Sequence, residues 1–212
     1  MWTMRLQTSR LVLEDVGERP NPEEFLRVFN TNPDFIEAAY RFAGKPKQSY
    51  ELWEIQRYLF QETIRENSHC LAIRLRKAGE LVGTVAFVAP HQELPSPWIG
   101  LLIISGEHQS QGLGSEAATA LEKHLMAEGW ADVRLAVLQA LPKARRFWER
   151  LGFIVYEEWE DEKKRACWLM RKVLSPKAVH QHRPQQGPLT PRPRAPAGED
   201  VGSLEAWTPM YP

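Results

Sequence analysis

The spacing of hydrophobic and polar positions changes on either side of a short glycine-containing segment. Residues 98–104 (WIGLLII) form an apolar run, which indicates a buried strand. Residues 113–128 instead predict a helix, because apolar side chains recur at every fourth position and therefore lie on one face. These recurring apolar residues are Leu113, Ala117, Leu121 and Leu125. The middle of the chain is thus expected to fold as a strand, a bend and a helix.

The rest of the pattern predicts a mixture of strands and helices. Further strands are expected at residues 10–16, 70–75, 80–88, 133–139, 153–159 and 167–173. Helices are expected after a cap at Asn21, from Ser49 to about Asn67, and over residues 141–151, with a short apolar segment at 35–42. Gly79 supports a hairpin turn. Gly83 stands inside a predicted strand, which indicates a bulge or a close backbone approach.

Two of these helices have a predicted buried face. The helix after Asn21 is expected to bury Phe25, Val28 and Phe29. The helix capped by Ser49 is expected to turn Leu52, Ile55, Leu59 and Ile64 inward. It also carries the large residues Trp53, Tyr58 and Phe60, and we expect at least two of them to pack in the core.

Residues 109–115 (QSQGLGS), which we call the glycine bend, join the central strand to the central helix. A glycine-rich turn that opens a helix directs unpaired backbone N–H groups and the positive end of the helix dipole at one spot. Gly112 and Gly114 would let a bulky anion approach the backbone closely. The Lys-Ser/Thr pair of a Walker loop is missing, as are the third glycine and later acid of the dinucleotide fingerprint. The bend therefore predicts a site for a diphosphate.

Two motifs together resemble the GNAT family of N-acetyltransferases. Gln109, Gly112 and Gly114 stand at the three fixed positions of its motif A, Gln/Arg-x-x-Gly-x-Gly/Ala. Residues 144–153 (ARRFWERLGF) resemble its later signature, Asn-x-x-Ala-x-x-Phe-Tyr-x-x-x-Gly-Phe. Residues 6–13 also resemble the opening strand of the branch that includes ribosomal-protein N-terminal acetylases. The resemblance covers roughly residues 6–173.

The resemblance implies transfer of an acetyl group from acetyl-CoA to a primary amine, without a metal. It implies an α/β (α+β) fold with a mixed, mostly antiparallel sheet of about six or seven strands. This sheet would be flanked by helices and splayed at the cofactor site, beside the strand at residues 133–139. The residues expected to bind the cofactor are Ile103, Ile104, Gln109, Ser110, Gln111, Gly112, Leu113, Gly114, Ser115, Ala144 and Trp148.

The chain departs from the family pattern at two positions. Trp148 stands where the family often has a tyrosine that protonates the leaving thiolate, and an indole N–H can only donate a hydrogen bond. Leu141 replaces an asparagine that contacts the cofactor. Trp148 would either wall the pantetheine channel or belong to the core. Both departures keep open the alternative of a non-catalytic acyl-CoA-binding or sensing module, and a scaffold with a partner-recruiting tail is a third hypothesis.

The acceptor amine must lose its proton before it attacks. At pH 7 this costs about 4–5 kcal/mol for a lysine-type amine but only about 1 kcal/mol for an α-amine. A base is therefore more important for an alkylamine than for a peptide N-terminus. The candidate bases are His91, Glu93 and Glu107. Peptide N-termini and small-molecule amines are the expected acceptors.

Composition narrows the remaining choices. The 27 basic and 27 acidic residues cancel, which argues against nucleic-acid binding through bulk charge. Cys70 and Cys167 lack metal-ligand spacing and are expected to be buried, reduced thiols. No apolar run is long enough to cross a bilayer, and the N-terminus has no signal-peptide core. We therefore expect a cytoplasmic protein without nucleic-acid or membrane partners, with a homodimer as a further option.

The composition also divides the chain into two parts. Residues 1–174 are expected to form the acetyltransferase domain. Residues 175–212 hold about half of the 16 prolines, and we expect this tail to be disordered because it cannot bury enough apolar surface to offset its ordering entropy.

Overall fold

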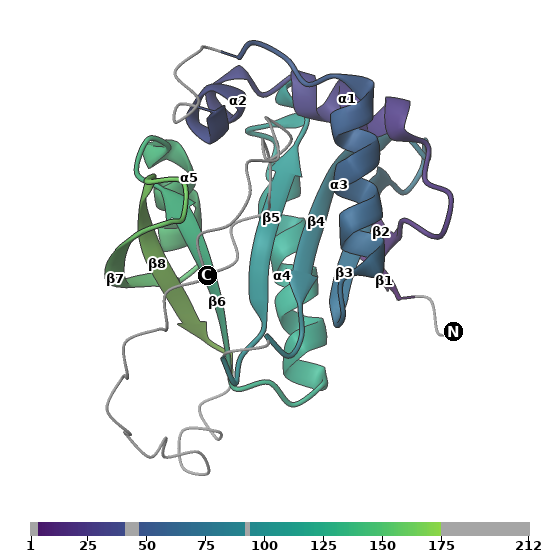
Figure 1. The fold of residues 1–212 in the computed structure, drawn as a ribbon. Coiled ribbons are helices and arrows are strands. Elements are labelled where there is room, and N and C mark those ends of the chain that lie inside the picture. Colours follow the sequence, from purple (N-terminus) through teal and green to yellow (C-terminus); the bar gives the residue numbers. More distant parts are fainter. Residues whose placement is uncertain (1–3, 41–46, 92–93, 175–212) are drawn as a thin grey trace.

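The computed structural model describes residues 4–40, 47–91 and 94–174, so the predictions for Glu93 and for the tail lie outside the described residues. Within these ranges, eight strands form one sheet in the order β1-β2-β3-β4-β5-β6-β8-β7 (Figure 1). The strands are β1 (Arg5–Gln7), β2 (Leu11–Asp15), β3 (Ser68–Leu75), β4 (Leu81–Val88), β5 (Trp98–Ile104), β6 (Asp132–Leu138), β7 (Ile154–Glu160) and β8 (Ala166–Val173). All neighbours are antiparallel except β5 and β6. The predicted mixed, mostly antiparallel sheet is confirmed.

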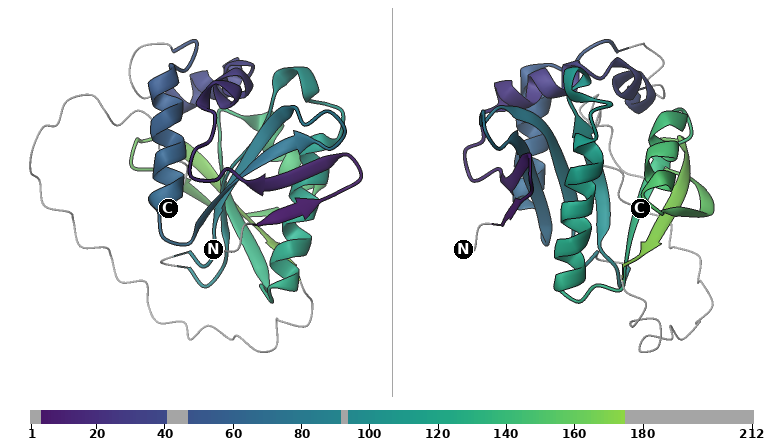
Figure 2. Two further views of the ribbon diagram at one scale, coloured as in Figure 1. Left: turned by 90° about the vertical axis from the view of Figure 1, so that its right-hand side faces the viewer. Right: turned by 180° about the vertical axis from the view of Figure 1, so that it is seen from behind.

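Five α-helices in the described part of the chain cover the two faces of this sheet. They are α1 (Pro22–Asn30), α2 (Pro33–Tyr40), α3 (Leu52–Ile64), α4 (Leu113–Ala127) and α5 (Pro142–Arg150), and a 3-10 turn, η2 (Gly106–His108), precedes α4. Helices α1 and α3 lie on one face, whereas α4 and α5 lie on the other (Figure 2). Each face has its own apolar core: Leu121 and Phe153 belong to the α4 side, and Phe29 and Tyr58 belong to the α3 side.

Helix α1 forms as its sequence predicts. The Asn21 side chain accepts a hydrogen bond from the Glu23 N–H at 3.1 Å, which satisfies one donor of the first turn. Phe25, Val28 and Phe29 are buried on the sheet side. Capping and periodicity therefore agree for this helix, and the prediction is confirmed.

Helix α3 corrects two predictions. Its N-cap is Glu51, not Ser49, because Glu51 and Glu54 form a reciprocal capping box. Of the three large aromatic residues only Tyr58 is buried, while the outward face of the helix exposes Trp53, Phe60 and Ile64. These three residues are spaced seven and four apart, so they lie on one side of the helix. The opposite side of the helix packs on the sheet, and this side therefore faces away from it.

The strands β4 and β5 approach each other closely at Gly83. A Cβ atom at this position would lie 2.4 Å from the carbonyl oxygen of Ile103, and the register between β3 and β4 shifts beside the same residue. The predicted bulge and close approach are both confirmed. Gly79 turns the β3–β4 hairpin with a φ of +70°, as expected.

Both cysteines are buried and free, as predicted. Burial raises the pKa of the Cys70 thiol to about 12 and that of Cys167 to about 11, so neither thiol ionises near neutral pH. In the described part of the chain, no helix combines the length and the apolar character that spanning a membrane requires.

Candidate active site

The parallel strands β5 and β6 part along their length. They pair only at their start, where Trp98 faces Arg134 and Ile99 faces Leu135. Beyond this point β5 follows β4 and β6 follows β8, so the two strands diverge toward their carboxyl ends (Figure 1). This divergence is the predicted splay, and among the described residues it leaves one edge of β5 without a strand partner.

The register of β5 decides which of its main-chain groups face the open edge. The Ser105 N–H donates to Val82 at 2.8 Å, and the Ile103 carbonyl lies against Gly83, so both face β4. Because main-chain groups alternate along a strand, those of Leu102 and Ile104 face the open edge. Ile103, one of the residues expected to bind the cofactor, therefore turns its main-chain groups toward β4, and Leu102 presents main-chain groups at the open edge instead.

The glycine bend follows β5 after the short turn η2. Ser110 and Gly112 both have positive φ angles, +61° and +79°, and Gly112 is the N-cap of α4 without a side-chain cap. Six successive N–H groups, from Ser110 to Ser115, find no acceptor among the residues that the structure describes. The bend is exposed at Gly112. A run of free donors at a helix N-terminus is suited to a phosphate or diphosphate, so the residues fit the predicted ligand.

The side chains of the two glutamines build the bend. Gln109 Nε2 donates to Asn32 Oδ1 at 2.6 Å and to the Ile104 carbonyl at 3.0 Å. Gln111 Nε2 donates to the Glu107 carbonyl at 3.0 Å. These contacts fasten the bend to the end of β5 and to the segment between α1 and α2, so its N–H groups are held in place before any ligand binds.

The two glycines of the bend differ in their surroundings and in their backbone conformation. A Cβ atom on Gly114 would lie 3.4 Å from the Phe147 ring and 3.5 Å from Ile104 Cγ1. An added methyl group would therefore make only ordinary van der Waals contacts there, and the expected close approach of an anion at Gly114 stays a prediction. Its N–H stays among the free donors, while Gly112 supplies the left-handed turn.

The two departures from the family motif are explained by packing. The Trp148 ring is 7% exposed and its centroid lies 5.0 Å from those of Phe147 and Phe153. Of the two alternatives for Trp148, the structure supports the core. Leu141 is the N-cap of α5, and its half-buried side chain packs on a small apolar cluster around Leu138 and Cys167. The half-buried Ala144 packs on the larger cluster of the α4 side.

The candidate bases do not gather at one point. The His91 side chain is buried, and its ring centroid lies 5.9 Å from that of Trp98, at the closed end of the β5–β6 divergence. Glu107 is exposed on η2 and lines a groove of about 550 Å³ beneath α1, together with Glu24 and Arg27. None of the residues that line this groove belongs to β6, so Glu107 faces a groove that is separate from the β5–β6 split. Of the two described candidates, His91 is therefore the one that lies nearer to the split.

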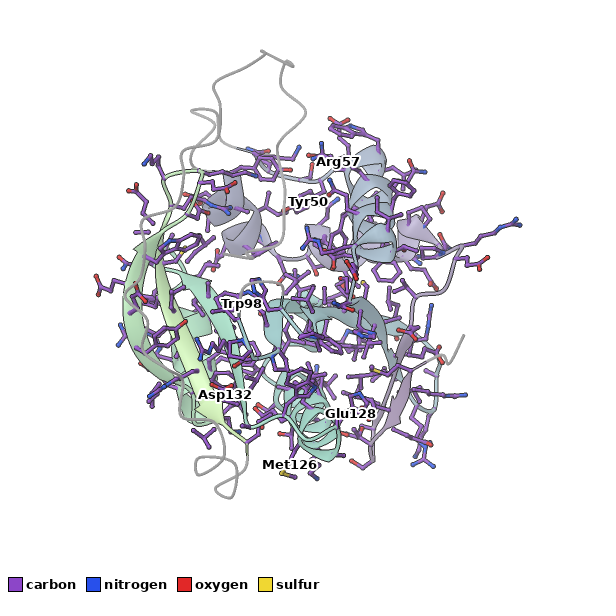
Figure 3. The ribbon with its side chains drawn as sticks, turned by 60° about the horizontal axis from the view of Figure 1, so that its bottom comes forward. Tyr50, Arg57, Trp98, Met126, Glu128 and Asp132 are labelled. Atoms are coloured by element: carbon purple, nitrogen blue, oxygen red, sulfur yellow. The ribbon has the colours of Figure 1, made fainter. Side chains whose placement is uncertain are left out.

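A buried polar cluster beside α2 and α3 was not predicted. Glu54 accepts hydrogen bonds from Tyr40 Oη at 2.7 Å and from the Glu51 N–H at 2.8 Å, and it pairs with Lys47 Nζ at 2.8 Å. Burial raises the pKa of Glu54, but the hydrogen bonds from Lys47 and Tyr40 outweigh it and the pKa is lowered. A carboxylate so engaged is a poor base. Figure 3 shows Tyr50 on the side of the molecule where α2 and α3 lie.

A second unpredicted cluster joins the β1–β2 turn to α4. Glu116 accepts from Thr8 Oγ1 at 2.5 Å, from Ser9 Oγ at 3.1 Å and from the Arg10 N–H at 2.9 Å, and Arg10 Nε lies 2.6 Å away. Burial raises the pKa of Glu116, but these four contacts outweigh burial and lower the pKa to about 2. Sequence patterns carry no signal for this cluster, because more than a hundred residues separate its two sides.

Comparisons with known proteins agree with this geometry. A family model for the acetyltransferase (GNAT) family matches residues 32–153, which is more than half of the 212 residues. An acetyltransferase from Thermus thermophilus superposes with a TM-score of 0.60 at 22% identity, covering 79% of this chain and 98% of that one. A spermidine N-acetyltransferase from Vibrio cholerae in complex with CoA and spermine gives a TM-score of 0.57 at 19% identity, covering 79% and 97%. A comparison with curated proteins finds no significant match.

The mixed, split sheet with a donor-rich bend at the end of β5 defines an α/β protein of the acetyltransferase type. The chain belongs to the GNAT acetyltransferase family, since the family model spans more than half of its length. The narrower resemblance to ribosomal-protein N-terminal acetylases remains a prediction.

Proposed function

We propose that this protein transfers an acetyl group from acetyl-CoA to a primary amine. The observation that carries the proposal is the run of six N–H groups at the glycine bend, from Ser110 to Ser115, that have no acceptor within the described chain. Charge-assisted hydrogen bonds to a diphosphate contribute roughly 1.5–3 kcal/mol each. Several of them together are enough to anchor one end of a CoA molecule.

The open edge of β5 would hold the rest of the donor. Main-chain groups of Leu102 and the N–H of Ile104 face this edge and can pair with the pantetheine amides as one strand pairs with another. The Ile104 carbonyl already accepts from Asn32 and Gln109. This arrangement directs the thioester toward the closed end of the split, where a strand N–H can stabilise the oxyanion of the tetrahedral intermediate.

Positioning would supply most of the acceleration, since holding two reactants in line is worth about 7–11 kcal/mol. The amine nitrogen forms the new bond to the acetyl carbon, and the carbon–sulfur bond then breaks to release the CoA thiolate. Because Trp148 cannot donate a full proton, this thiolate leaves without an acid from that position. A thiol pKa near 8.5 makes the thiolate a fair leaving group, so the step is slowed but not prevented.

His91 is the residue that we assign to the acceptor side as a base. It is buried beside Trp98 at the closed end of the split, on a loop that follows β4. A base at this place would take a proton from the attacking amine directly or through one water molecule. Peptide N-termini and small amines are the proposed acceptors, and the spermine held by the Vibrio cholerae structure supports small amines as one class.

An acceptor screen tests the proposal. The purified protein is incubated with acetyl-CoA and a panel of peptides, polyamines and monoamines while free thiol is measured. Acceptor-dependent thiol release that is lost in Gly112→Val supports transfer. Tight acetyl-CoA binding without thiol release for any amine would instead favour the alternative, an acyl-CoA-binding or sensing module, which the buried Trp148 and the apolar Leu141 motivate.

A further inference from the structure

One side chain from the opposite end of the sequence reaches the glycine bend. Arg10, in the turn between β1 and β2, places Nη1 2.9 Å from the Gln111 carbonyl and Nε 2.6 Å from Glu116 Oε2. Because the guanidinium is planar, these two contacts set its orientation and therefore also the position of its third nitrogen. That nitrogen, Nη2, lies 3.4 Å from the position that a Cβ atom of Gly112 would take. The guanidinium therefore presents an N–H edge beside the donors of the bend.

Arg10 also changes the charge at this end of α4. Glu116 is the fourth residue of the helix, one turn beyond Gly112 and next to the end of the bend, so its carboxylate would repel a diphosphate bound there. The side chain of Glu116 is only 16% exposed, and solvent therefore screens its charge incompletely. The ion pair with Arg10 cancels this charge, since the two formal charges of +1 and −1 sum to zero.

We propose that Arg10 binds the diphosphate of the acyl-CoA donor. Its Nη1 holds the Gln111 carbonyl away from the ligand, its Nε neutralises Glu116, and its Nη2 donates to a phosphate oxygen. Thr8 and Ser9 complete the anchor by binding the same carboxylate. This inference rests on the proposed function and adds to it a residue of segment 6–13 that lies outside the glycine bend and outside residues 144–153.

The test compares two donors in Arg10→Gln. The dissociation constant of acetyl-CoA is measured by calorimetry, and that of S-acetylpantetheine, which lacks the diphosphate, is measured in the same buffer. Loss of one charge-assisted hydrogen bond predicts an acetyl-CoA affinity at least about tenfold weaker, whereas S-acetylpantetheine should bind as it does to the wild type. Arg10→Lys keeps the charge without the forked contacts, so part of the affinity should return.

Lys123→Gln is the matched control, because it removes an equal charge from the same helix two turns beyond the bend. It should leave the acetyl-CoA affinity within about twofold of the wild type. An equal loss in Lys123→Gln and Arg10→Gln would overturn the proposal, because the effect would then be one of overall charge. A parallel loss of S-acetylpantetheine affinity in Arg10→Gln would also overturn it, since that result indicates a general distortion of the site.

The outcomes separate this inference from the function on which it rests. A wild-type protein that binds no acetyl-CoA contradicts the proposed function itself. A wild-type protein that binds it, with unchanged affinity in Arg10→Gln, contradicts only the role of Arg10. Circular dichroism shows whether Arg10→Gln folds. If it does not, Arg10→Lys decides the matter. An Arg10→Lys variant that binds acetyl-CoA with full wild-type affinity and with an unchanged dependence of that affinity on salt would contradict the forked contact between Arg10 and the diphosphate.

Discussion

At the scale of single residues, the chemistry of this protein depends on a backbone conformation more than on a titrating side chain. Gly112 could be predicted from the sequence because a positive φ at a helix start needs glycine. The bases could not be ranked in this way, because the ranking of His91 and Glu107 depends on the surroundings that the fold gives each of them. The role of Trp148 likewise became clear only from its packing on Phe153.

Glu116 gives a pH-dependent prediction at this scale. Its pKa in the folded protein, about 2, lies below the ordinary value of 4.5, so its contribution to stability is present above pH 4.5 and is lost as the pH falls toward 2. Glu116→Gln should therefore lower the free energy of unfolding by about 1–2 kcal/mol at pH 7, after allowance for solvent screening.

Denaturant unfolding of wild type and Glu116→Gln at several pH values measures this difference, which should shrink below pH 4.5. The control, Glu128→Gln, changes an exposed carboxylate just beyond the other end of α4 and should alter stability by less than about 0.5 kcal/mol. A difference between wild type and Glu116→Gln that stays constant from pH 7 to pH 3 would contradict the account.

At the scale of elements, close packing of β4 on β5 fixes the strand that carries the site. Gly83→Ala would place a methyl group 2.4 Å from the Ile103 carbonyl oxygen and 2.8 Å from Ile104 Cδ1. Overpacking of this kind costs about 1–3 kcal/mol, and relief would push β5 toward its open edge. We therefore expect a lower midpoint of urea unfolding and weaker acetyl-CoA binding in the same variant.

Gly79→Asn provides the comparison for that experiment. Gly79 has a positive φ, which asparagine tolerates, and no atom of the described chain lies within 4 Å of an added Cβ. Its unfolding midpoint and acetyl-CoA affinity should stay close to those of the wild type. If Gly83→Ala behaves like Gly79→Asn in both measurements, the close approach of β4 and β5 does not control the site.

Sequence periodicity predicted most of these elements but missed features that depend on distant partners. The three residues of β1 are too few to show a pattern, and they form a strand because β2 pairs with them. Ser49 resembles a helix cap, yet Glu51 prevails because Glu54 stands at the correct spacing for a capping box. Ile64 was expected to face inward, and at least two of Trp53, Tyr58 and Phe60 were expected in the core, because helical spacing alone does not reveal which side meets the sheet.

At the scale of the whole molecule, the family motifs predicted the type of fold, but the order of the strands could not be read from the sequence. β8 lies between β6 and β7, so the last hairpin inserts its second strand beside β6. This order depends on contacts between residues that are far apart in the chain. The cytoplasmic location and the homodimer also stay predictions, because one chain does not test them.

The proposed domain boundary gives a prediction at this scale. Leu174 donates its N–H to the Ala131 carbonyl at 2.8 Å and packs on the core of the α4 side. A chain that ends after Leu174 therefore keeps every described residue of the four apolar clusters. We expect its melting temperature to stay within about 2 °C of the full-length value, equivalent to less than about 1 kcal/mol.

Acetyl-CoA binding should be equally unaffected by this truncation, because the glycine bend and β5 lie within the retained part. A chain that ends after Arg171 serves as the positive control, since it removes residues that pair with β6. A large loss of stability or affinity on removal of residues 175–212 alone would contradict the proposed boundary.

Calorimetric titration with acetyl-CoA tests the central claim most directly, in the wild type, Gly112→Val and Gly129→Val. The two valines replace glycines with positive φ at opposite ends of α4, so they impose similar backbone strain, but only Gly112 lies in the glycine bend. The account predicts one saturable site in the wild type with a dissociation constant below about 1 mM, at least about tenfold weaker binding in Gly112→Val, and little change in Gly129→Val. Absence of saturable binding in the wild type, or equal affinity in all three folded proteins, would contradict it.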